Sequence, residues 1–311
     1  MARRRGRRST GQIFLYILSG VVVLSMALGY AFLGAPAPQP TPTLPPAAQT
    51  ANRTAAPAAG PSATPAPLPT MTPVPLAARP TLDPSATAYS FAVIGESADN
   101  PNVYKALLNQ IVADGNSFLI HLGNMTAKGS AAEFQAWRES MADFPLPVYT
   151  VPGNQDAPDG SLANYLAFTG APGPHYSFDI GQVHFAVADA SRGYLVAEET
   201  AWLDADLAAT QKPVKIVALH YPPFDPRGSG QVLTMGNEAF TTLMRHRGVR
   251  YVFAGHIRAY DQSTRDGVIY VISGGGGAPL SRSADQGGFY HYVRVSVNGT
   301  DVQTEVRRLA Q

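Results

Sequence analysis

Polar side chains follow a series of apolar runs in the C-terminal part of this chain, and a glycine usually stands between the two. These side chains are carboxylates, amides, imidazoles and one guanidinium, at Glu96, Asn124, Asn154, Gln155, Asp156, His220, His256 and Arg258. Such side chains bind polar ligands through charge and hydrogen bonds. If they converge in space, the sequence predicts a ligand-binding cleft at one edge of a sheet.

The apolar runs that precede these residues have the composition of buried β-strands. They read FAVIG, FLIHLG, VYTVPG, IVALH and YVFAG. A β-branched run that stops at a glycine turn delivers the next side chain to the edge of a sheet. Because open α/β sheets bind ligands at the carboxyl ends of their strands, we expect the polar side chains to share one cleft.

Segments with helical spacing of apolar residues alternate with these strands from Tyr89 onward. Helices are expected at residues 101–114, 131–142, 162–168, 197–209 and 237–247. Two β-hairpins are also expected, one around Gly181 and one at Asn298-Gly299, a dipeptide typical of tight hairpin turns. Alternating strands and helices followed by a strand-rich end predict two sheets covered by helices.

Composition limits the classes of partner. The chain has 311 residues, of which 45% are hydrophobic, enough for a globular core, and it has no cysteine for disulfides or thiolate metal sites. Residues 89–311 carry 16 lysines and arginines against 21 aspartates and glutamates, a net charge of about five negative. A net-negative domain without a basic run is a poor partner for nucleic acid, so we expect none.

The N-terminus has the pattern of a membrane anchor. Residues 1–12 carry five arginines, and the uncharged run Ile13–Leu33 that follows has 21 residues. At about 1.5 Å per residue, this run matches the roughly 30 Å hydrocarbon core of a bilayer. We expect a single-pass anchor with a cytoplasmic N-terminus and an extracytoplasmic C-terminal domain. Small residues from Ala31 to Ala37 leave a cleaved signal peptide as the alternative.

Residues 34–88 are a low-complexity mixture of proline, alanine and threonine. Such a segment cannot bury much apolar surface, and it predicts a disordered, semi-extended linker. The sequence therefore divides into a basic segment (1–12), a transmembrane segment (13–33), a linker (34–88) and a folded domain (89–311).

The ordered motifs GES, HLGN, GNQD, ALHYPP and GHIR, with Trp202-Leu203 before the fourth, resemble the calcineurin-like metallophosphoesterase superfamily, which includes the purple acid phosphatases. The resemblance covers Tyr89 to the C-terminus. It implies an α/β fold, a four-layer α/β/β/α sandwich of two mixed sheets. It also implies a hydrolytic site with two divalent ions and a bridging water, which would act on phosphoesters.

The sequence departs from the family pattern at several positions. That pattern is Asp-x-His, Gly-Asp, Gly-Asn-His-Asp/Glu, a lone His and Gly-His-x-His. Asn154, His220 and His256 match it. The departures are Glu96 for the first Asp, Ala98 for the first His, Asn124 for the bridging Asp, Gln155 for the assisting His and Arg258 for the last His. Gln155 and Asp156 therefore occupy the candidate catalytic positions.

These departures fall unevenly on the two metal positions that the resemblance implies. The first would need Glu96, Ala98, Asn124 and Arg258, and a guanidinium cannot lose its proton to become a ligand. The second would keep four neutral ligands, Asn124, Asn154, His220 and His256. Such a set can hold one zinc, manganese or iron ion weakly, or none, because it lacks the anionic bridge.

Two hypotheses follow from this reading. The first is a membrane-anchored domain that has lost two-metal hydrolysis and binds a ligand or acts as a scaffold. The alternative is an active phosphoester hydrolase with a remodelled, single-metal site. A third hypothesis, a lectin-like or cell-wall adhesin, is supported only by the linker. We also expect Arg258 to occupy the vacated first position and to form a bidentate pair with Glu96. The remaining histidines are assigned structural roles, and Gly274–Gly277 a loop beside the site.

Overall fold

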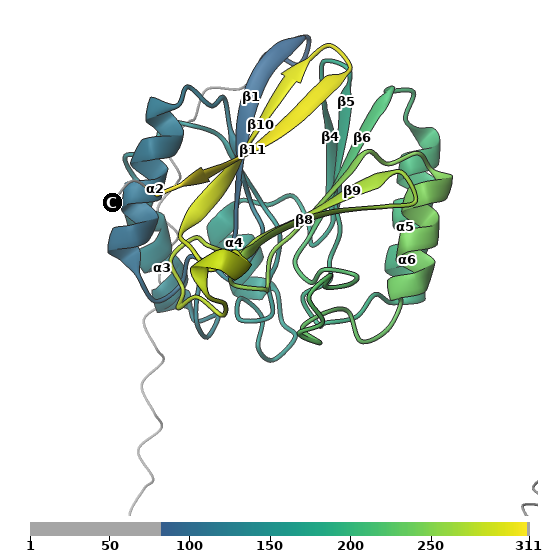
Figure 1. The fold of residues 1–311 in the computed structure, drawn as a ribbon. Helices are drawn as coiled ribbons and strands as arrows, with labels where there is room; N and C mark the ends of the chain where they lie inside the picture. The colour runs from purple at the N-terminus through teal and green to yellow at the C-terminus, as the bar shows by residue number, and fades with distance from the viewer. Residues whose placement is uncertain (1–81, 310–311) are drawn as a thin grey trace, which may run out of the picture. The chain divides into compact units, whose positions relative to one another are not determined.

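The computed structural model describes residues 82–309, which form two mixed β-sheets (Figure 1). The five-stranded sheet has the order β11-β10-β1-β2-β3, with β1 (Ala88–Ile94), β2 (Leu119–His121), β3 (Val148–Thr150), β10 (His291–Asn298) and β11 (Asp301–Arg308). Strands β1, β2 and β3 are parallel, whereas β10 is antiparallel to both β1 and β11. The segments that follow β1, β2 and β3 therefore leave the sheet at one edge.

The second sheet has six strands in the order β4-β5-β6-β7-β9-β8. Their bounds are β4 (Tyr176–Ile180), β5 (Val183–Val187), β6 (Val214–Leu219), β7 (Tyr251–Ala254), β8 (Tyr260–Arg265) and β9 (Val268–Ser273). The central strands β5, β6, β7 and β9 are parallel, and both edge strands are antiparallel to their neighbours. Parallel strands buried on both faces explain why their sequences are continuously apolar.

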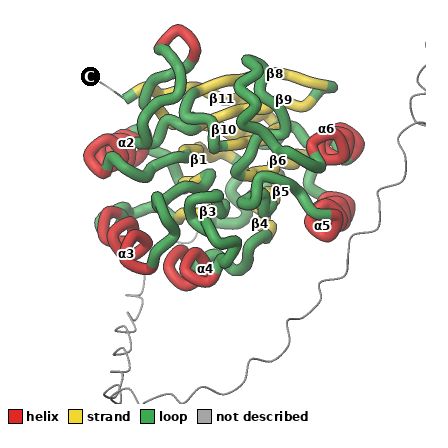
Figure 2. Tube along the Cα trace, turned by 90° about the horizontal axis from the view of Figure 1, so that it is seen from below, coloured by secondary structure: helices red, strands yellow, loops and turns green. Residues whose placement is uncertain are grey.

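Helices cover the outer faces of the two sheets (Figure 2). Helices α2 (Pro101–Ala113), α3 (Ala131–Ser140) and α4 (Ala163–Thr169) lie on the first sheet, and α5 (Ala197–Ala209) and α6 (Asn237–His246) on the second. One apolar cluster fills the space between the sheets, with Phe91, Phe118, Phe185 and Phe253 in its centre. These layers confirm the predicted α/β/β/α order of two mixed sheets.

The sequence marks where the helices begin. The Asn100 side chain accepts the Val103 N–H at 3.2 Å, and Pro101 occupies the first turn of α2. Ser130 and Glu133 form a capping box at the start of α3. Because caps satisfy N–H groups that have no partner within the helix, they fix these two ends next to the loops that follow β1 and β2.

Three details differ from the sequence-based expectations. Strand β8 was not predicted, and its alternating polar pattern fits an edge strand. In the β10–β11 hairpin, Asn298 pairs with Asp301, so Gly299 is the first loop residue, with a φ of 60°. Residues before Tyr89 also belong to the domain, because Leu82 and Ala86 pack against the core between the sheets. Residues 82–88 thus belong to the fold rather than to the linker.

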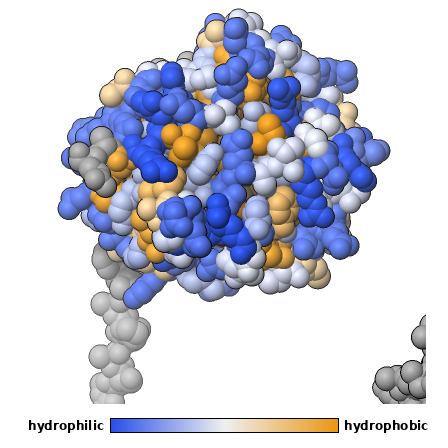
Figure 3. Space-filling view, in the orientation of Figure 1, coloured by the Kyte–Doolittle hydropathy of each residue, from blue (hydrophilic) through white to orange (hydrophobic). Residues whose placement is uncertain are grey.

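Within residues 82–309, no helix is long and apolar enough to cross a membrane. The predicted membrane segment Ile13–Leu33 and linker residues 34–81 lie outside the described residues. Polar residues cover most of the face of the domain in Figure 3, with smaller apolar areas between them. Val112, Val196 and Met235 are the exposed large apolar residues of the described chain, and they are distant in sequence.

Candidate functional site

The predicted site residues follow five parallel strands. Glu96, Asn124 and Asn154 come after β1, β2 and β3 of the first sheet, and His220 and His256 come after β6 and β7 of the second. Hydrogen bonds and short contacts connect them across the sheets, as described below, and Arg258 joins them from the loop after β7. The convergence inferred from strand ends is therefore found.

Three of these residues have a left-handed backbone, which is uncommon for residues other than glycine. The φ angles are 62° at Glu96, 58° at Asn124 and 61° at His256, and each residue directly follows a glycine. Such conformations cost roughly 1–3 kcal/mol each and cluster at functional sites. They turn three side chains from the strand ends toward one another.

Glycines allow the loops of the site to approach closely. A Cβ atom on Gly153 would lie 2.3 Å from Asn124 Oδ1, and one on Gly123 would lie 2.7 Å from His220 Nδ1. No side chain fits at such distances, so these two glycines are required where the loops after β2, β3 and β6 meet. This contact explains the Gly-Asn pairs in both loops.

Asn124 is the centre of the hydrogen-bond network. Its Nδ2 donates to Glu96 Oε1 at 2.8 Å and to Asn154 Oδ1 at 3.2 Å, and its Oδ1 accepts the Gln155 N–H at 2.9 Å. The side chain is buried, with 2% of the residue exposed. A neutral amide with satisfied donors thus occupies the position where the family resemblance implies a bridging carboxylate.

The two matching histidines lie next to each other, and His220 also contacts Asn154. His220 is fully buried, and its Nδ1 donates to the Leu122 carbonyl at 2.7 Å, which leaves a lone pair on Nε2. Burial lowers the pKa of His220 to about 3, so the ring is neutral. Nε2 lies 3.0 Å from Asn154 Oδ1 and 3.3 Å from His256 Nδ1. The Asn154 oxygen and this nitrogen both offer lone pairs, and a cation would satisfy both.

Glu96 completes a set that can hold one ion. Its Oε1 lies 3.7 Å from His220 Nε2, and the ligand atoms of Glu96, His220 and His256 all lie within 4.8 Å of one another. Imidazole nitrogens with carboxylate and amide oxygens suit zinc, manganese or iron. One divalent ion therefore fits the donors at the second position.

The first position does not fit an ion, because Arg258 reaches into it. Arg258 Nε donates to Glu96 Oε2 at 3.1 Å; 1% of the Glu96 side chain and 28% of the Arg258 side chain are exposed. The predicted pair forms, but through a single N–H rather than the expected bidentate contact. Burial raises the pKa of Glu96 to about 8, although Arg258 opposes the rise.

Replacing Arg258 by alanine is expected to destabilise the fold increasingly as the pH rises. With Arg258 present, burial raises the pKa of Glu96 to about 8, so the carboxyl is mainly protonated at pH 6.5 and Arg258 then stabilises it little. Above pH 8 the parent gains the ionised, paired form, whereas without Arg258 the pKa of Glu96 lies higher and the variant loses this stabilisation. We expect a loss of about 1–2 kcal/mol at pH 9, less than the about 3–5 kcal/mol for a fully buried pair, since Arg258 is partly exposed. Denaturant unfolding at both pH values measures this difference.

The exposed Arg245, in the last turn of α6, provides the matched control. Arg245→Ala is expected to change stability by less than about 0.5 kcal/mol at both pH values. An Arg258→Ala effect that is equal at pH 6.5 and pH 9 would contradict the proposed coupling to the Glu96 charge.

Asp156 holds the loops rather than facing the cleft. Its carboxylate accepts the backbone N–H groups of Asn124 at 2.7 Å, Gly153 at 3.0 Å and Thr126 at 3.0 Å, and the Thr126 hydroxyl at 3.0 Å. It is 1% exposed and is absent from the described residues that line the cleft. The candidate catalytic position at 156 is thus occupied by a residue that positions Asn124.

Gln155, the other candidate catalytic residue, does line the cleft. Its Oε1 is buried without a hydrogen-bond partner among residues 82–309. The cleft has a volume of about 370 Å³, enough for a small ligand. Its walls are Glu96, Asn124, Asn154, Gln155, Gln231, His256, Arg258, Pro279, Leu280 and Ser281.

Several residues at or beside the cleft were not predicted. Tyr221 does not line it, but its ring lies against that of His256, with centroids 3.7 Å apart and planes tilted by 30°. An aromatic residue directly after His220 was the available signal. Gln231 and Leu280 come from loops far apart in the sequence, and no pattern marked them. Buried ion pairs connect these loops, since Arg282 contacts Asp225 at 2.6 Å and Asp261 at 3.4 Å.

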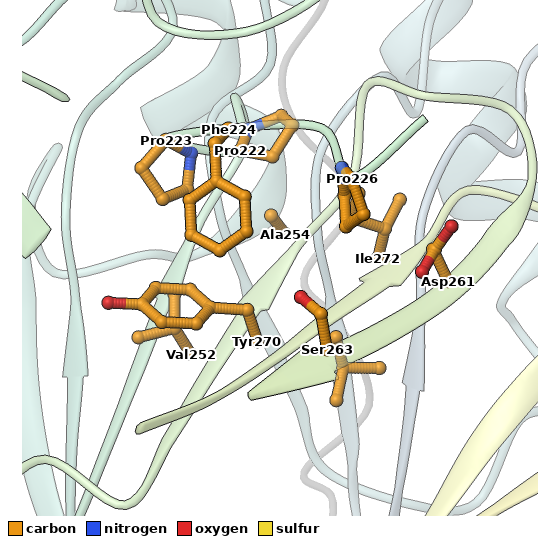
Figure 4. A pocket seen from close by; sticks show the side chains of 11 residues that line it. Pro222, Pro223, Phe224, Pro226, Val252, Ala254, Asp261, Ser263, Tyr270 and Ile272 are labelled. Carbon is orange, nitrogen blue, oxygen red and sulfur yellow. The ribbon is translucent and has the colours of Figure 1, made fainter. Parts of the chain in front are cut away.

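The loop after His220 packs against the second sheet (Figure 4). Pro222, Pro223 and Phe224 lie over Tyr270 and Ala254, and the rings of Phe224 and Tyr270 have centroids 4.8 Å apart. The gap that remains has a volume of only about 10 Å³. It is close to the limit for a single water molecule and is no ligand site.

Four of the other described histidines have partners that fit structural roles, whereas His246 lies exposed at the end of α6. His175 contacts Glu199 at 2.7 Å, and His184 contacts Asp179 at 2.7 Å and Asp206 at 2.8 Å. His121 and His291 are fully buried and hydrogen-bond to Ser97 and Phe289. The glycine-rich segment 274–277 lies against Glu96, whose carbonyl accepts the Ala278 N–H at 2.9 Å.

Comparison with known proteins agrees with this geometry. The model of the calcineurin-like phosphoesterase family matches residues 89–260. A 3′,5′-cyclic-nucleotide phosphodiesterase from Nostoc sp. is 25% identical over 163 residues, covering 50% of this chain and 60% of that protein. Purple acid phosphatase 15 from Arabidopsis thaliana is 32% identical over 116 residues, which cover 33% of this chain and 22% of that protein. The chain thus spans less than two thirds of these curated relatives.

Solved structures share the fold at low sequence identity. A purple acid phosphatase from yellow lupin superposes with a TM-score of 0.61 at 15% identity, covering 73% of this chain and 52% of that one. GAP50, described as the anchor in the inner membrane complex of Plasmodium, superposes with a TM-score of 0.60 at 12% identity. The match covers 73% of this chain and 86% of GAP50.

Proposed function

The chain belongs to the calcineurin-like phosphoesterase family, and we propose that it is a member with lost or strongly impaired two-metal hydrolysis that binds a ligand or acts as a scaffold. The observation that carries this proposal is the contact between Arg258 and Glu96 at 3.1 Å. The permanent positive charge of Arg258 stands where a metal ion would bind, and its contact with Glu96 uses one of the remaining carboxyl groups of the site. Asn124 further removes the anionic bridge that two ions would share.

An active hydrolase with a single-metal site is the alternative. His220, His256, Asn154 and Glu96 would hold the ion, as the short distances among their donor atoms support. A bound divalent ion would supply Lewis-acid polarisation of a phosphoryl oxygen and would lower the pKa of a bound water. Within the cleft, Arg258 and Gln155 would orient the phosphoester.

The chain is further proposed to be anchored in the cell membrane through Ile13–Leu33, with its N-terminus in the cytoplasm and residues 82–309 outside. The length of the uncharged run and the five preceding arginines support this topology. A neighbour described as a membrane-complex anchor is compatible with a non-catalytic use of the fold. Protease added to intact cells should remove the domain, and release of a soluble chain that begins between residues 31 and 40 would show a cleaved signal peptide instead.

The purified full-length chain is expected to hold less than one equivalent of tightly bound divalent ion and to leave aryl phosphate mono- and diesters unhydrolysed. The physical reason is that removal of several members of one catalytic unit leaves little of its rate. Elemental analysis and phosphate release, with zinc, manganese or iron added, measure both quantities.

The outcomes separate the two candidate functions. Two equivalents of metal with metal-dependent turnover would contradict the impaired site. One equivalent with turnover that is lost in His220→Ala would support the single-metal hydrolase. Binding of one ion without turnover would agree with the proposed loss of hydrolysis but would contradict the expected metal content.

A further inference from the structure

The cleft holds a cation whose hydrogen-bond donors are only partly used. Arg258 Nε donates to Glu96 Oε2 at 3.1 Å, whereas no hydrogen bond joins the two terminal nitrogens of Arg258, Nη1 and Nη2, to any of residues 82–309. These two nitrogens are also not among the buried polar atoms of those residues that lack a partner, and 28% of the Arg258 side chain is exposed. A bound molecule can therefore reach them.

Contacts on both sides hold the guanidinium at the wall of the cleft. Its Nε contacts Glu96, which lines the cleft. The Arg258 carbonyl accepts the Ser281 N–H at 3.1 Å and the Ser281 hydroxyl at 3.3 Å, so the backbone of Arg258 is joined to the segment 279–281, which lines the same cleft. Because these contacts already restrict the Arg258 side chain, little of its conformational freedom is left to lose when a ligand binds.

Charge limits the ligand to a single negative charge. Among the described residues that line the cleft, Arg258 is the one permanent cation and Glu96 the one acid. Burial lowers the pKa of His256 to about 4, so this ring adds no charge near neutral pH. The net charge of the cleft thus lies between zero and one positive. A singly charged anion matches it, whereas a phosphate monoester dianion would leave negative charge without a partner.

Shape and acceptor strength favour a carboxylate among the singly charged anions. The terminal N–H groups of a guanidinium form a planar fork that matches the two oxygens of a carboxylate. A phosphodiester also carries one charge, but it is far less basic and is therefore a weaker acceptor. Pro279 and Leu280 add an apolar surface to the cleft. A cavity of about 150 Å³ holds benzene, so about 370 Å³ accommodates an aromatic acid.

We propose that the cleft binds a small monocarboxylate without a metal ion, with the carboxylate on Nη1 and Nη2 of Arg258 and the apolar part of the acid against Leu280 and Pro279. This inference rests on the proposed function, in which Arg258 stands where the first metal ion would bind, and it adds the class of ligand. Metal content and phosphate release test that function separately, so the two can fail independently.

Benzoate is the probe, and equilibrium dialysis with the purified full-length chain at pH 7 in the presence of EDTA measures its binding. We expect a dissociation constant of about 1 mM. Benzamide has the same shape without the charge and should bind at least about tenfold more weakly, because it loses the charged hydrogen bonds. Phenyl phosphate and dimethyl phosphate should also bind more weakly than benzoate.

Two variants locate the bound benzoate. Arg258→Gln should weaken its binding by more than about tenfold, and at pH 7, below the pKa of Glu96, this variant is expected to remain folded, which circular dichroism checks. Arg245→Gln, at an exposed position of α6, should leave binding unchanged.

Four results would overturn the proposal. They are a lack of saturable benzoate binding in EDTA, equal binding of benzoate and benzamide, tighter binding of either phosphate, and unchanged benzoate binding by a folded Arg258→Gln variant. The comparison of benzoate with benzamide uses the unmodified chain, so it decides the matter even if Arg258→Gln does not fold.

Discussion

Five substitutions together, Glu96→Asp, Ala98→His, Asn124→Asp, Gln155→His and Arg258→His, are expected to raise the bound metal from at most one to two divalent ions per chain. They restore the carboxylates and imidazoles that the family resemblance implies at these positions. Hydrolysis of an aryl phosphate should rise by about 10²–10⁴-fold over the unmodified chain, since the two ions activate water and stabilise the phosphoryl charge together.

The structure indicates that the fold tolerates the central change, Asn124→Asp. Asn124 has a φ of 58°, and aspartate is one of the few other residues that adopt this conformation readily. The introduced carboxylate would face Glu96 Oε1 and Asn154 Oδ1 without the amide protons that now connect them. The oxygen atoms of residues 96, 124 and 154 would then lie close together without a hydrogen-bond donor between them. A bound cation would stabilise this arrangement.

A fourfold variant that keeps Arg258 is the matched control. Its guanidinium would still occupy the first position, so it should bind no more than one ion and show little hydrolysis. Elemental analysis, phosphate release and circular dichroism should be measured on both variants. A folded fivefold variant that binds fewer than two ions would show that loop geometry, and not the lost ligands alone, prevents two-metal binding.

Much of this site was predictable because strand ends follow simple rules. The residue at the carboxyl end of a parallel strand lies at one edge of the sheet. This placed Glu96, Asn124 and His256, which follow glycines, together with His220, which directly follows β6. The pairing of Arg258 with Glu96 followed from two complementary substitutions at one implied metal position. Its single N–H contact was not predictable, because it depends on the path of the loop after β7.

Other features depend on long-range contacts that a sequence does not record. Gln231 and Leu280 reach the cleft because the ion pairs of Arg282 hold their loops in place. Strand β8 has a polar alternating sequence whose pairing with β9 is decided by the register of the sheet. Asp156 looked like a catalytic acid because sequence position cannot show that backbone N–H groups surround its carboxylate.

Asp156→Asn is expected to lower the free energy of unfolding by about 2–4 kcal/mol, which for a domain of this size lowers the melting temperature by roughly 10 °C. Burial raises the pKa of Asp156 to about 6 and its hydrogen bonds oppose the rise, so the carboxyl is ionised at pH 7.5. It then accepts N–H groups from Asn124, Gly153 and Thr126. An asparagine side chain would turn its NH₂ group toward these N–H donors. The stability lost with the broken hydrogen bonds exceeds the stability gained by removing a buried charge.

Asp159→Asn provides the control in the same loop. Its carboxylate accepts the Ser161 N–H at 2.9 Å at an exposed position, so the same substitution there should cost less than about 0.5 kcal/mol. Denaturant unfolding at pH 7.5 compares the two. Because Asp156 fixes Asn124, its loss should also weaken binding of any ion at His220 and His256, while Asp159→Asn leaves that binding unchanged. If Asp156→Asn were as stable as the parent, the loops after β2 and β3 would be held by packing at the glycines, and the carboxylate would be free for a role in the cleft.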